Sequence, residues 1–178
     1  MSILAVAVVI VGALCLTNLV LIFGIIRRLR EHTALLSEQA HADLPVTGLA
    51  AGDTPPAFTV TTSEGRIAAG PSGLRLVAFF SSSCSLCPKR VPVFADYVRE
   101  NRLGRDDVLA VVLGDADEPV PYLDQLETVA QTRRELENGE LATAFKVSGY
   151  PAFCLLDADG AVLASGYDPA TLPAPVAA

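Results

Sequence analysis

The sequence is poor in the side chains that most often bind metal ions in proteins. Its 178 residues include only 2 histidines and 4 cysteines, and no tryptophan. His32 and His41 both lie in the polar segment after the N-terminal apolar run, and no second close pair of cysteines accompanies Cys84 and Cys87. Because a tetrahedral zinc site needs four ligands, we predict no metal site. Four cysteines are also too few for a fold held together mainly by disulfides.

Basic residues are scarce in the rest of the chain. Residues 43–178 carry 10 Lys and Arg against 18 Asp and Glu, a formal net charge of −8. Binding to a phosphate backbone needs a basic surface, so we expect no nucleic-acid partner. Most of these charges are better explained as the solvated acidic surface of a soluble domain.

One long stretch has no charge at all. Ile3–Ile26 spans 24 residues rich in Leu, Val, Ile and Ala, and a helix needs roughly 20 such residues to cross a bilayer. A cleaved secretory signal would carry positive charge before its apolar core and a small-residue cleavage site after it, whereas here three arginines follow the run and none precedes it. We therefore predict a transmembrane anchor at residues 1–26, a juxtamembrane stalk and linker at 27–51, and a domain at 52–178.

The arginines that follow this run bear on the orientation of the domain. Arg27, Arg28 and Arg30 close the apolar run, and only the α-amino group precedes it. Taken literally, the positive-inside rule would place the arginines and the domain after them in the cytoplasm.

Within the domain, apolar periodicity alternates between strand-like and helix-like segments. Short continuous apolar runs predict buried strands, and the Asp-Gly dipeptide between the last two predicts a hairpin. Helical spacing follows Cys87 and includes Pro92. Residues 119–139 are mostly polar and give only a weak helical signal, with candidates for one apolar face at Tyr122, Leu123, Leu126 and Val129. The order predicts a mixed α/β sandwich with an antiparallel edge. Strands are predicted at residues 57–61, 74–80, 108–113, 152–157 and 161–165, and a second helix at 140–145.

The pair Cys84 and Cys87 follows the central strand-like run after three serines. A cysteine in the first turn of a helix is stabilised as a thiolate by the helix dipole and by unpaired backbone N–H groups. Two cysteines separated by two residues can also close a disulfide, so that one attacks a client disulfide and the other resolves the mixed intermediate. The spacing and context favour redox chemistry over a metal half-site or a structural bridge.

Four features occur in a fixed order along the chain: Gly52–Phe58, the strand followed by Cys84-x-x-Cys87 with Pro92 five residues later, Val147–Pro151, and the hairpin Phe153–Ser165. Together they resemble thioredoxin-fold proteins, and the whole chain resembles the membrane-anchored TlpA/ResA-type thiol-disulfide oxidoreductases. The resemblance implies a thioredoxin-like three-layer sandwich, with a mixed central sheet between flanking helices, preceded by one transmembrane helix.

The resemblance also implies roles for individual residues. Cys84 would be the exposed nucleophile and Cys87 the resolving cysteine. A cis bond before Pro151 would leave the backbone of Tyr150 free to pair with an extended client strand beside Cys84. Without the resemblance, Pro151 would be an ordinary trans proline and Tyr150 a surface aromatic. The implied partners are a protein thiol or disulfide client and a redox partner protein, with no cofactor.

Within this family the chain is most similar to the MauD proteins in its anchor, its Arg-Arg-Leu-Arg-Glu-His segment and its Ser-Ser-Ser-Cys sequence. These are thioredoxin-like accessory proteins associated with maturing the disulfide-rich small subunit of methylamine dehydrogenase, and they are assigned to the outer side of the cytoplasmic membrane. The resemblance implies a single-pass protein of the cell membrane with an extracytoplasmic domain, in conflict with the charge rule.

The chain departs from thioredoxins at two positions near the cysteines. Ser83 stands where thioredoxins have a tryptophan, and Ala78 stands where they have a buried aspartate that accepts a proton from the resolving cysteine. Proton transfer must then use water or another group. The missing acid is the main support for an alternative function, a non-catalytic binding module or maturation factor that escorts a client. Cys154, in an apolar strand, is predicted to be a core thiol.

Overall fold

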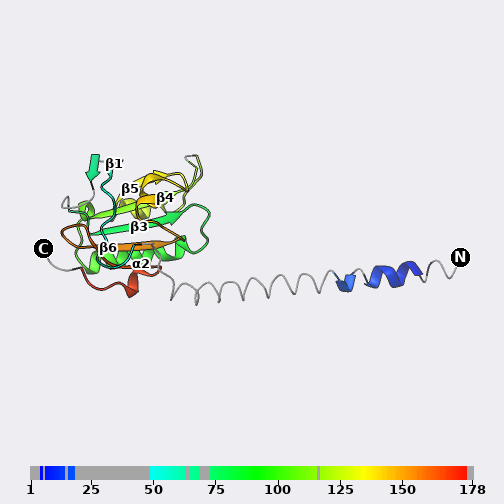
Figure 1. The fold of residues 1–178 in the computed structure, drawn as a ribbon. Coiled ribbons are helices and arrows are strands. Elements are labelled where there is room, and N and C mark those ends of the chain that lie inside the picture. Colours follow the sequence, from blue (N-terminus) through cyan, green and yellow to red (C-terminus); the bar gives the residue numbers. More distant parts are fainter. Residues whose placement is uncertain are drawn as a thin grey trace. The chain divides into compact units, whose positions relative to one another are not determined.

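The computed structural model describes the chain in two separate units, an N-terminal helix and an α/β domain (Figure 1). Most of the predicted stalk and linker at residues 27–51 lies outside the described residues, as do His32 and His41. The described residues are 5, 7–14, 16–18, 49–62, 65–68, 73–115 and 117–175.

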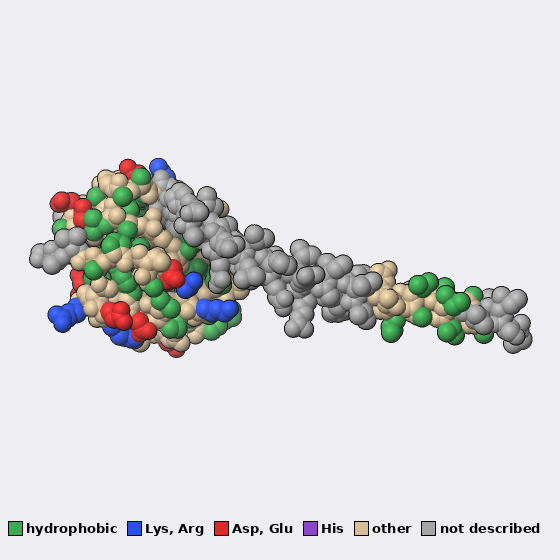
Figure 2. Space-filling view, turned by 90° about the horizontal axis from the view of Figure 1, so that it is seen from below, with side chains coloured by type: hydrophobic (Ala, Val, Ile, Leu, Met, Phe, Trp, Pro, Cys, Tyr) green, Lys and Arg blue, Asp and Glu red, His purple; other side chains and the backbone are tan. Residues whose placement is uncertain are grey.

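The N-terminal helix comprises residues 5, 7–14 and 16–18 of the predicted anchor. Its large apolar side chains are more than half exposed, from 54% for Ile10 to 70% for Val9 (Figure 2). Among the residues that the structure describes, no helix is both long and apolar enough to cross a membrane. The other residues of the predicted span at 1–26 lie outside the description.

A five-stranded mixed sheet forms the centre of the domain, in the order β5-β4-β3-β6-β7. Strand β3 pairs in parallel with β4, and β4 with β5. Strand β6 pairs antiparallel with β3, and β7 with β6, which confirms the predicted antiparallel edge. The strands are β3 (Leu76–Ser81), β4 (Val108–Leu113), β5 (Gln131–Glu135), β6 (Ala152–Leu156) and β7 (Val162–Gly166).

The remaining elements cover the two faces of this sheet and one of its edges. The predicted helix after Cys87 is present and contains Pro92, and a short hairpin of β1 and β2 precedes the sheet in sequence. The weakly patterned residues 119–139 hold α3, where the sequence carries a weak helical signal, and the edge strand β5, which sequence periodicity did not predict. The elements are α2 (Cys87–Glu100), α3 (Leu123–Glu127), α4 (Glu140–Ala144), the 3₁₀ turns η1 (Arg105–Asp107) and η2 (Pro169–Thr171), β1 (Thr59–Thr62) and β2 (Gly65–Ala68).

Alternate residues of β3 face opposite sides of the sheet and build two separate cores. Ala78 and Phe80 pack with side chains of α2 and α3, whereas Val77 and Phe79 pack with those of α4. Because both faces of the sheet are covered, β3 and β4 are continuous apolar runs. This is the three-layer arrangement predicted from the sequence.

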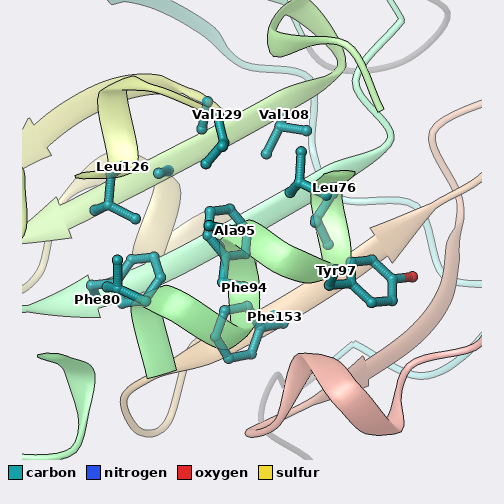
Figure 3. Close-up of a cluster of buried hydrophobic side chains, with 14 of the residues drawn as sticks. Leu76, Phe80, Phe94, Ala95, Tyr97, Val108, Leu126, Val129 and Phe153 are labelled. Atoms are coloured by element: carbon teal, nitrogen blue, oxygen red, sulfur yellow. The ribbon is translucent and has the colours of Figure 1, made fainter. Parts of the chain in front are cut away.

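Aromatic rings fill the core between the sheet and α2 (Figure 3). Phe80, Phe94 and Phe153 come from β3, α2 and β6, and their ring centroids lie 5.6–5.7 Å apart. Offset and edge-to-face pairs at such distances add to the stabilisation from burial alone. These ring contacts fix α2 against the end of β3.

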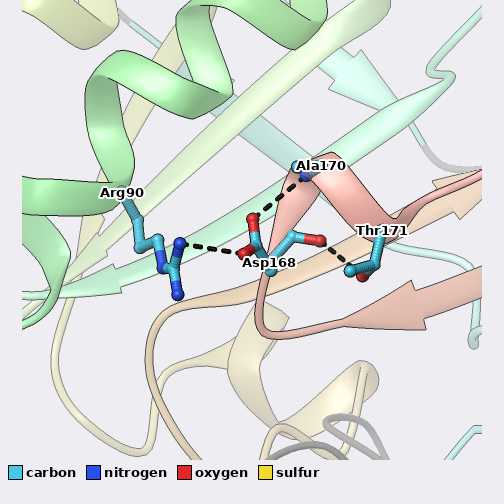
Figure 4. Close-up of polar contacts among 4 residues, drawn as sticks. All are labelled: Arg90, Asp168, Ala170 and Thr171. Carbon is cyan, nitrogen blue, oxygen red and sulfur yellow. Dashed lines mark hydrogen bonds and ion pairs between the residues drawn. The ribbon is translucent and has the colours of Figure 1, made fainter. Parts of the chain in front are cut away.

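A short tail packs against α2 beyond the last strand. Arg90 of α2 forms an ion pair of 2.8 Å with Asp168, whose side chain accepts a hydrogen bond from Ala170 N–H (Figure 4). The hydroxyl of Tyr97 donates to the carbonyl of Pro173 at 2.6 Å. The tail also holds the 3₁₀ turn η2.

Residues at the end of the predicted linker already contact the domain. Leu49 is buried in the core on the α4 side. Gly52 N–H donates to the carbonyl of Val162, and Val162 N–H donates to the carbonyl of Asp53, both at 2.8 Å. Leu49, near the end of the predicted linker, is thus part of the packed domain.

We predict that Gly114→Ala destabilises the protein more than Gly73→Ala does. Both glycines have positive φ, at +142° and +98°, so either alanine is strained by about 1–2 kcal/mol. Only at Gly114 would the new Cβ overlap another side chain, that of Ser82, which adds about 1 kcal/mol or more. Urea unfolding of the two variants measures the difference, and equal losses would contradict it.

Candidate active site

The parallel pairing of β3 and β4 brings their carboxyl ends to one edge of the sheet, where α/β folds commonly place their sites. Just beyond β3, Ser82 N–H donates to the carbonyl of Leu113 at 2.9 Å. The backbone N–H of Cys84 then donates to the carbonyl of Ser81 at 3.1 Å and closes a turn. Helix α2 begins at Cys87, so Cys84 lies just before the helix, whereas stabilisation by the helix dipole was expected for a cysteine in the first turn.

The two cysteines of the pair differ in exposure. Cys84 is partly exposed, while Cys87 is fully buried in the core under α2, and both are free thiols. The backbone N–H of Cys87 donates to Cys84 Sγ at 3.2 Å. Cys84 Sγ also lies 3.5 Å from the carbonyl oxygen of Tyr150, to which its S–H donates when protonated. The site therefore has one accessible sulfur above one buried sulfur.

A hydrogen bond between the two cysteine side chains separates the pKa values of the two thiols. The hydrogen bond from the Cys87 side chain is the largest cause that lowers the pKa of Cys84 to about 6, and backbone hydrogen bonds from Cys87 and Leu86 lower it further against the effect of burial. For Cys87, that hydrogen bond and burial raise the pKa well above its usual range. Near neutral pH, Cys84 is therefore the thiolate and Cys87 the thiol.

Tyr150 and Pro151 lie beside this pair, as the sequence predicted. The peptide bond between them is cis, which confirms the predicted isomer. Tyr150 is half-buried, and burial raises the pKa of its phenol, with Glu137 and Cys87 adding to the rise. The structure thus brings Cys84, Cys87 and Tyr150 together, with Pro151 next in the chain. The role of Tyr150 and Pro151 in client binding remains a prediction.

The position under the pair where thioredoxins have an acid is apolar in this chain. Ala78 is fully buried and pairs with Ala110 on one side and Phe153 on the other. The residue that does reach the site from the core is Tyr122, whose hydroxyl donates to the carbonyl of Ser81 at 2.9 Å. Sequence reasoning placed Tyr122 only on a possible helical face.

A polar contact lies at the outer side of the same edge. The hydroxyl of Ser82 donates to the carboxylate of Glu118, in the loop after β4. Arg134 donates to the carbonyls of Asp115 and Glu118, at 2.7 and 2.8 Å, and fixes that loop. Glu118 is distant in sequence from the serines before Cys84, and only the fold brings them together.

Cys154 belongs to the other side of the sheet. It lies in β6 and packs with Val77 and Phe79 in the core covered by α4, whereas Cys87 lies in the core covered by α2. Burial raises the pKa of Cys154 to about 12. The structure confirms the prediction that Cys154 is a buried core thiol.

Within the described part of the chain, no group of three or more His, Cys, Asp or Glu side chains is placed to hold a metal ion.

The domain is similar to several solved structures. They include a thio-disulfide isomerase from Thermus thermophilus (TM-score 0.52, 20% identity, covering 67% of this chain and 87% of that one). A proposed thiol:disulfide interchange protein, DsbE, from Chlorobium tepidum matches with a TM-score of 0.51 and 23% identity over 69% of this chain and 90% of that one. A thiol:disulfide interchange protein from Bacteroides sp. matches with a TM-score of 0.51 and 20% identity, over 68% and 86%.

At these identities the likeness establishes the fold, a mixed α/β thioredoxin-like fold with a central sheet and flanking helices. No protein-family model and no curated protein matches the sequence.

We predict that alkylation of Cys84 rises with pH through a midpoint near 6, because the thiolate is the nucleophile and its pKa is about 6. Cys87→Ala removes the largest cause of the lowered pKa, so the midpoint should move up toward the ordinary cysteine value of about 8.5. Cys87→Ser keeps a hydrogen-bond donor and should shift it less.

Peptide-resolved alkylation followed by mass spectrometry measures this midpoint. Cys154→Ala is the matched control, because it removes a buried thiol on the opposite face of the sheet and should leave the midpoint unchanged. A midpoint near 8.5 in the unmutated chain would contradict the assignment of Cys84 as the thiolate.

Proposed function

We propose that this protein is a membrane-tethered thiol-disulfide oxidoreductase that acts on protein clients through Cys84 and Cys87. The observation that carries the proposal is the arrangement of the pair: a partly exposed sulfur with a pKa lowered to about 6 lies over a fully buried thiol that hydrogen-bonds it. The names of the structures with the same fold concern the same reaction class.

The exchange needs only the two sulfurs. The Cys84 thiolate attacks one sulfur of a client disulfide, forms a mixed disulfide and releases the first client thiolate. Cys87 then loses its proton, attacks Cys84 Sγ and forms the Cys84–Cys87 disulfide, while the second client thiolate leaves. The client thus gains two electrons and the protein loses two. The reverse sequence oxidises a client dithiol, and a redox partner protein with a dithiol or disulfide restores the pair in either case.

The contact between the sulfurs also explains how Cys87 becomes reactive at the right step. The hydrogen bond to Cys84 is the largest cause of the raised pKa of Cys87. Once Cys84 is bonded to the client its sulfur is no longer an anion, so that cause is removed and the pKa of Cys87 falls. This fall in the pKa of Cys87 partly compensates for the absence of a buried acid at the position of Ala78. The proton of Cys87 then passes to the departing client thiolate or to water.

Client binding is proposed at the backbone of Tyr150, next to Pro151. The Tyr150 carbonyl lies 3.5 Å from Cys84 Sγ, so a client segment that brings a sulfur to Cys84 must pass beside this carbonyl. Pairing of an extended segment with exposed backbone is a common mode of peptide recognition and is tolerant of side-chain sequence.

The tether and its orientation are part of the proposal. Residues 3–26 carry no charge, and the helical residues described there expose apolar side chains, as a helix in lipid would. The resemblance to MauD proteins supports an extracytoplasmic domain, where disulfides persist. The arginines that follow the anchor weigh against that side.

A non-catalytic escort of a client is the second candidate. The observation that favours it is the fully buried Ala78, which places an apolar side chain where thioredoxins have a proton acceptor. The two functions differ in whether Cys84 ever becomes covalently linked to a client.

We predict that Cys87→Ser traps a client on Cys84 as a mixed disulfide, because no second thiol remains to resolve it. Serine keeps a hydrogen-bond donor next to Cys84. A larger species that disappears on reduction should be visible on non-reducing gels of cells expressing the variant.

Cys84→Ser combined with Cys87→Ser should abolish that species, and Cys154→Ser combined with Cys87→Ser should retain it. If no species forms and Cys84 also resists alkylation in the purified protein, the escort function is favoured over the enzyme.

We predict that a membrane-impermeant maleimide added to intact cells labels Cys84, while the chain stays in the membrane fraction. The expected label is lost in Cys84→Ser. Labelling that requires cell lysis would place the domain in the cytoplasm, as the positive-inside rule suggests, and recovery of the full chain in the soluble fraction would contradict the tether.

A further inference from the structure

Two donors converge on one backbone carbonyl at the end of β3. The carbonyl of Ser81 accepts the backbone N–H of Cys84 at 3.1 Å and the hydroxyl of Tyr122 at 2.9 Å. A carbonyl oxygen has two lone pairs, so these two bonds use its full accepting capacity. One bond comes from the nucleophile's own peptide group, and the other comes from a side chain 41 residues further along the chain.

Tyr122 is fixed in place by its ring. The residue is 4% exposed and lies in the core that contains Cys87, with its ring centroid 6.0 Å from that of Phe80. It precedes α3, in the loop that follows β4. A buried hydroxyl loses its bonds to water, so its bond to Ser81 is costly to remove.

We propose that Tyr122 is a positioning residue for the cysteine pair: its hydroxyl holds the Ser81 carbonyl that in turn holds the backbone N–H of Cys84. This inference rests on the proposed function, because it concerns the reactivity of the same two cysteines. The turn from Ser81 to Cys84 sets where Cys84 Sγ lies relative to the N–H of Cys87, 3.2 Å away. Tyr122 thereby links the loop after β4 to the reactivity of the nucleophile.

Tyr122 acts as a hydrogen-bond donor and not as the missing proton acceptor. Burial is the first cause that raises the pKa of its phenol, and the neighbouring Cys87, Cys84 and Glu118 add to the rise. The hydroxyl therefore keeps its proton throughout the reaction, and the amide carbonyl that it contacts is not a base. Its effect on the reaction passes through geometry.

Other ionisable groups around the pair come from several elements. Cys84 faces Cys87 from α2 and the backbone of Tyr150 from the loop before β6. Glu137 and Cys87 act on the Tyr150 phenol, and Glu118 contacts Ser82. Tyr122→Phe changes none of these groups, so a shift in Cys84 titration in that variant reports the lost hydroxyl.

The test compares Tyr122→Phe with Tyr97→Phe in the full chain. Both substitutions remove a buried tyrosine hydroxyl that donates to a backbone carbonyl, Ser81 in one case and Pro173 in the other. The matched control therefore reproduces the loss of a buried hydrogen bond and keeps the ring, but at the tail end of α2, away from the cysteines.

We expect Tyr122→Phe to raise the midpoint of Cys84 alkylation by about one pH unit, which is a tenfold change in the acid dissociation constant. Tyr97→Phe should leave the midpoint in place, even if it lowers the thermal unfolding temperature as much. Labelling of Cys154 under the same conditions reports whether either variant is unfolded, and it should stay low in both.

A midpoint in Tyr122→Phe that stays within a few tenths of a unit of the unmutated value would overturn the inference. So would an equal shift in both variants, because the effect would then be a general loss of packing. If labelling of Cys154 shows that Tyr122→Phe is unfolded, the titration is repeated in sucrose, which favours the folded state, and the same outcomes decide.

Failure of the proposed function gives a different result. If that function is wrong, Cys87→Ser traps no client, whatever the titration midpoint of Cys84 in the unmutated chain. If only the present inference is wrong, Cys87→Ser traps its client, Cys84 of the unmutated chain titrates near pH 6, and Cys84 of Tyr122→Phe titrates there too.

Discussion

The parallel pairing of β3 with β4 is the constraint on which the rest of the site depends. It brings the carboxyl ends of two buried strands together, and with them Ser81 and Leu113. Just beyond β3, the N–H of Ser82 donates a hydrogen bond to the carbonyl of Leu113 at the end of β4. The N–H of Cys84 then donates to the carbonyl of Ser81, the last residue of β3. This strand pairing therefore sets the position of Cys84, which precedes the first residue of α2.

The central strands and the cysteine pair could be predicted from the sequence because their signals are local. Strand β4 is buried on both faces, so it appears as an uninterrupted apolar run, and its predicted limits at 108–113 match the structure. The Asp-Gly hairpin and the spacing of Cys84 and Cys87 are equally local. Even the cis bond at Pro151 was predicted, although through family resemblance.

Strand β5 and Tyr122 could not be predicted because partners distant in sequence determine their roles. Strand β5 is polar, and its first residues are buried by the β1 hairpin, where Thr62 donates to the side chain of Gln131 at 3.1 Å. No periodicity marks such a strand. Tyr122 likewise has no local pattern, and its bond to Ser81 exists only because β4 lies beside β3. The start of α2 at Cys87 also needed the structure, since the serines before it do not cap the helix.

The sheet also separates the thiols of the domain into two environments. Cys84 and Cys87 share the core under α2, while Cys154 faces the core under α4, with the sheet between them. One hydrogen bond shapes both members of the pair, since it lowers the pKa of one sulfur and raises that of the other. The difference in pKa between the two thiols therefore arises mainly from their mutual contact.

The ion pair between Arg90 and Asp168 has a practical consequence for work on this chain. It joins the tail to the first turn of α2, and Tyr97 anchors the tail again at Pro173. The segment from Asp168 to Pro173 thus covers one side of α2. Affinity tags or fusion partners at the carboxyl end need to leave this segment intact, because shortening it would uncover that side of the helix.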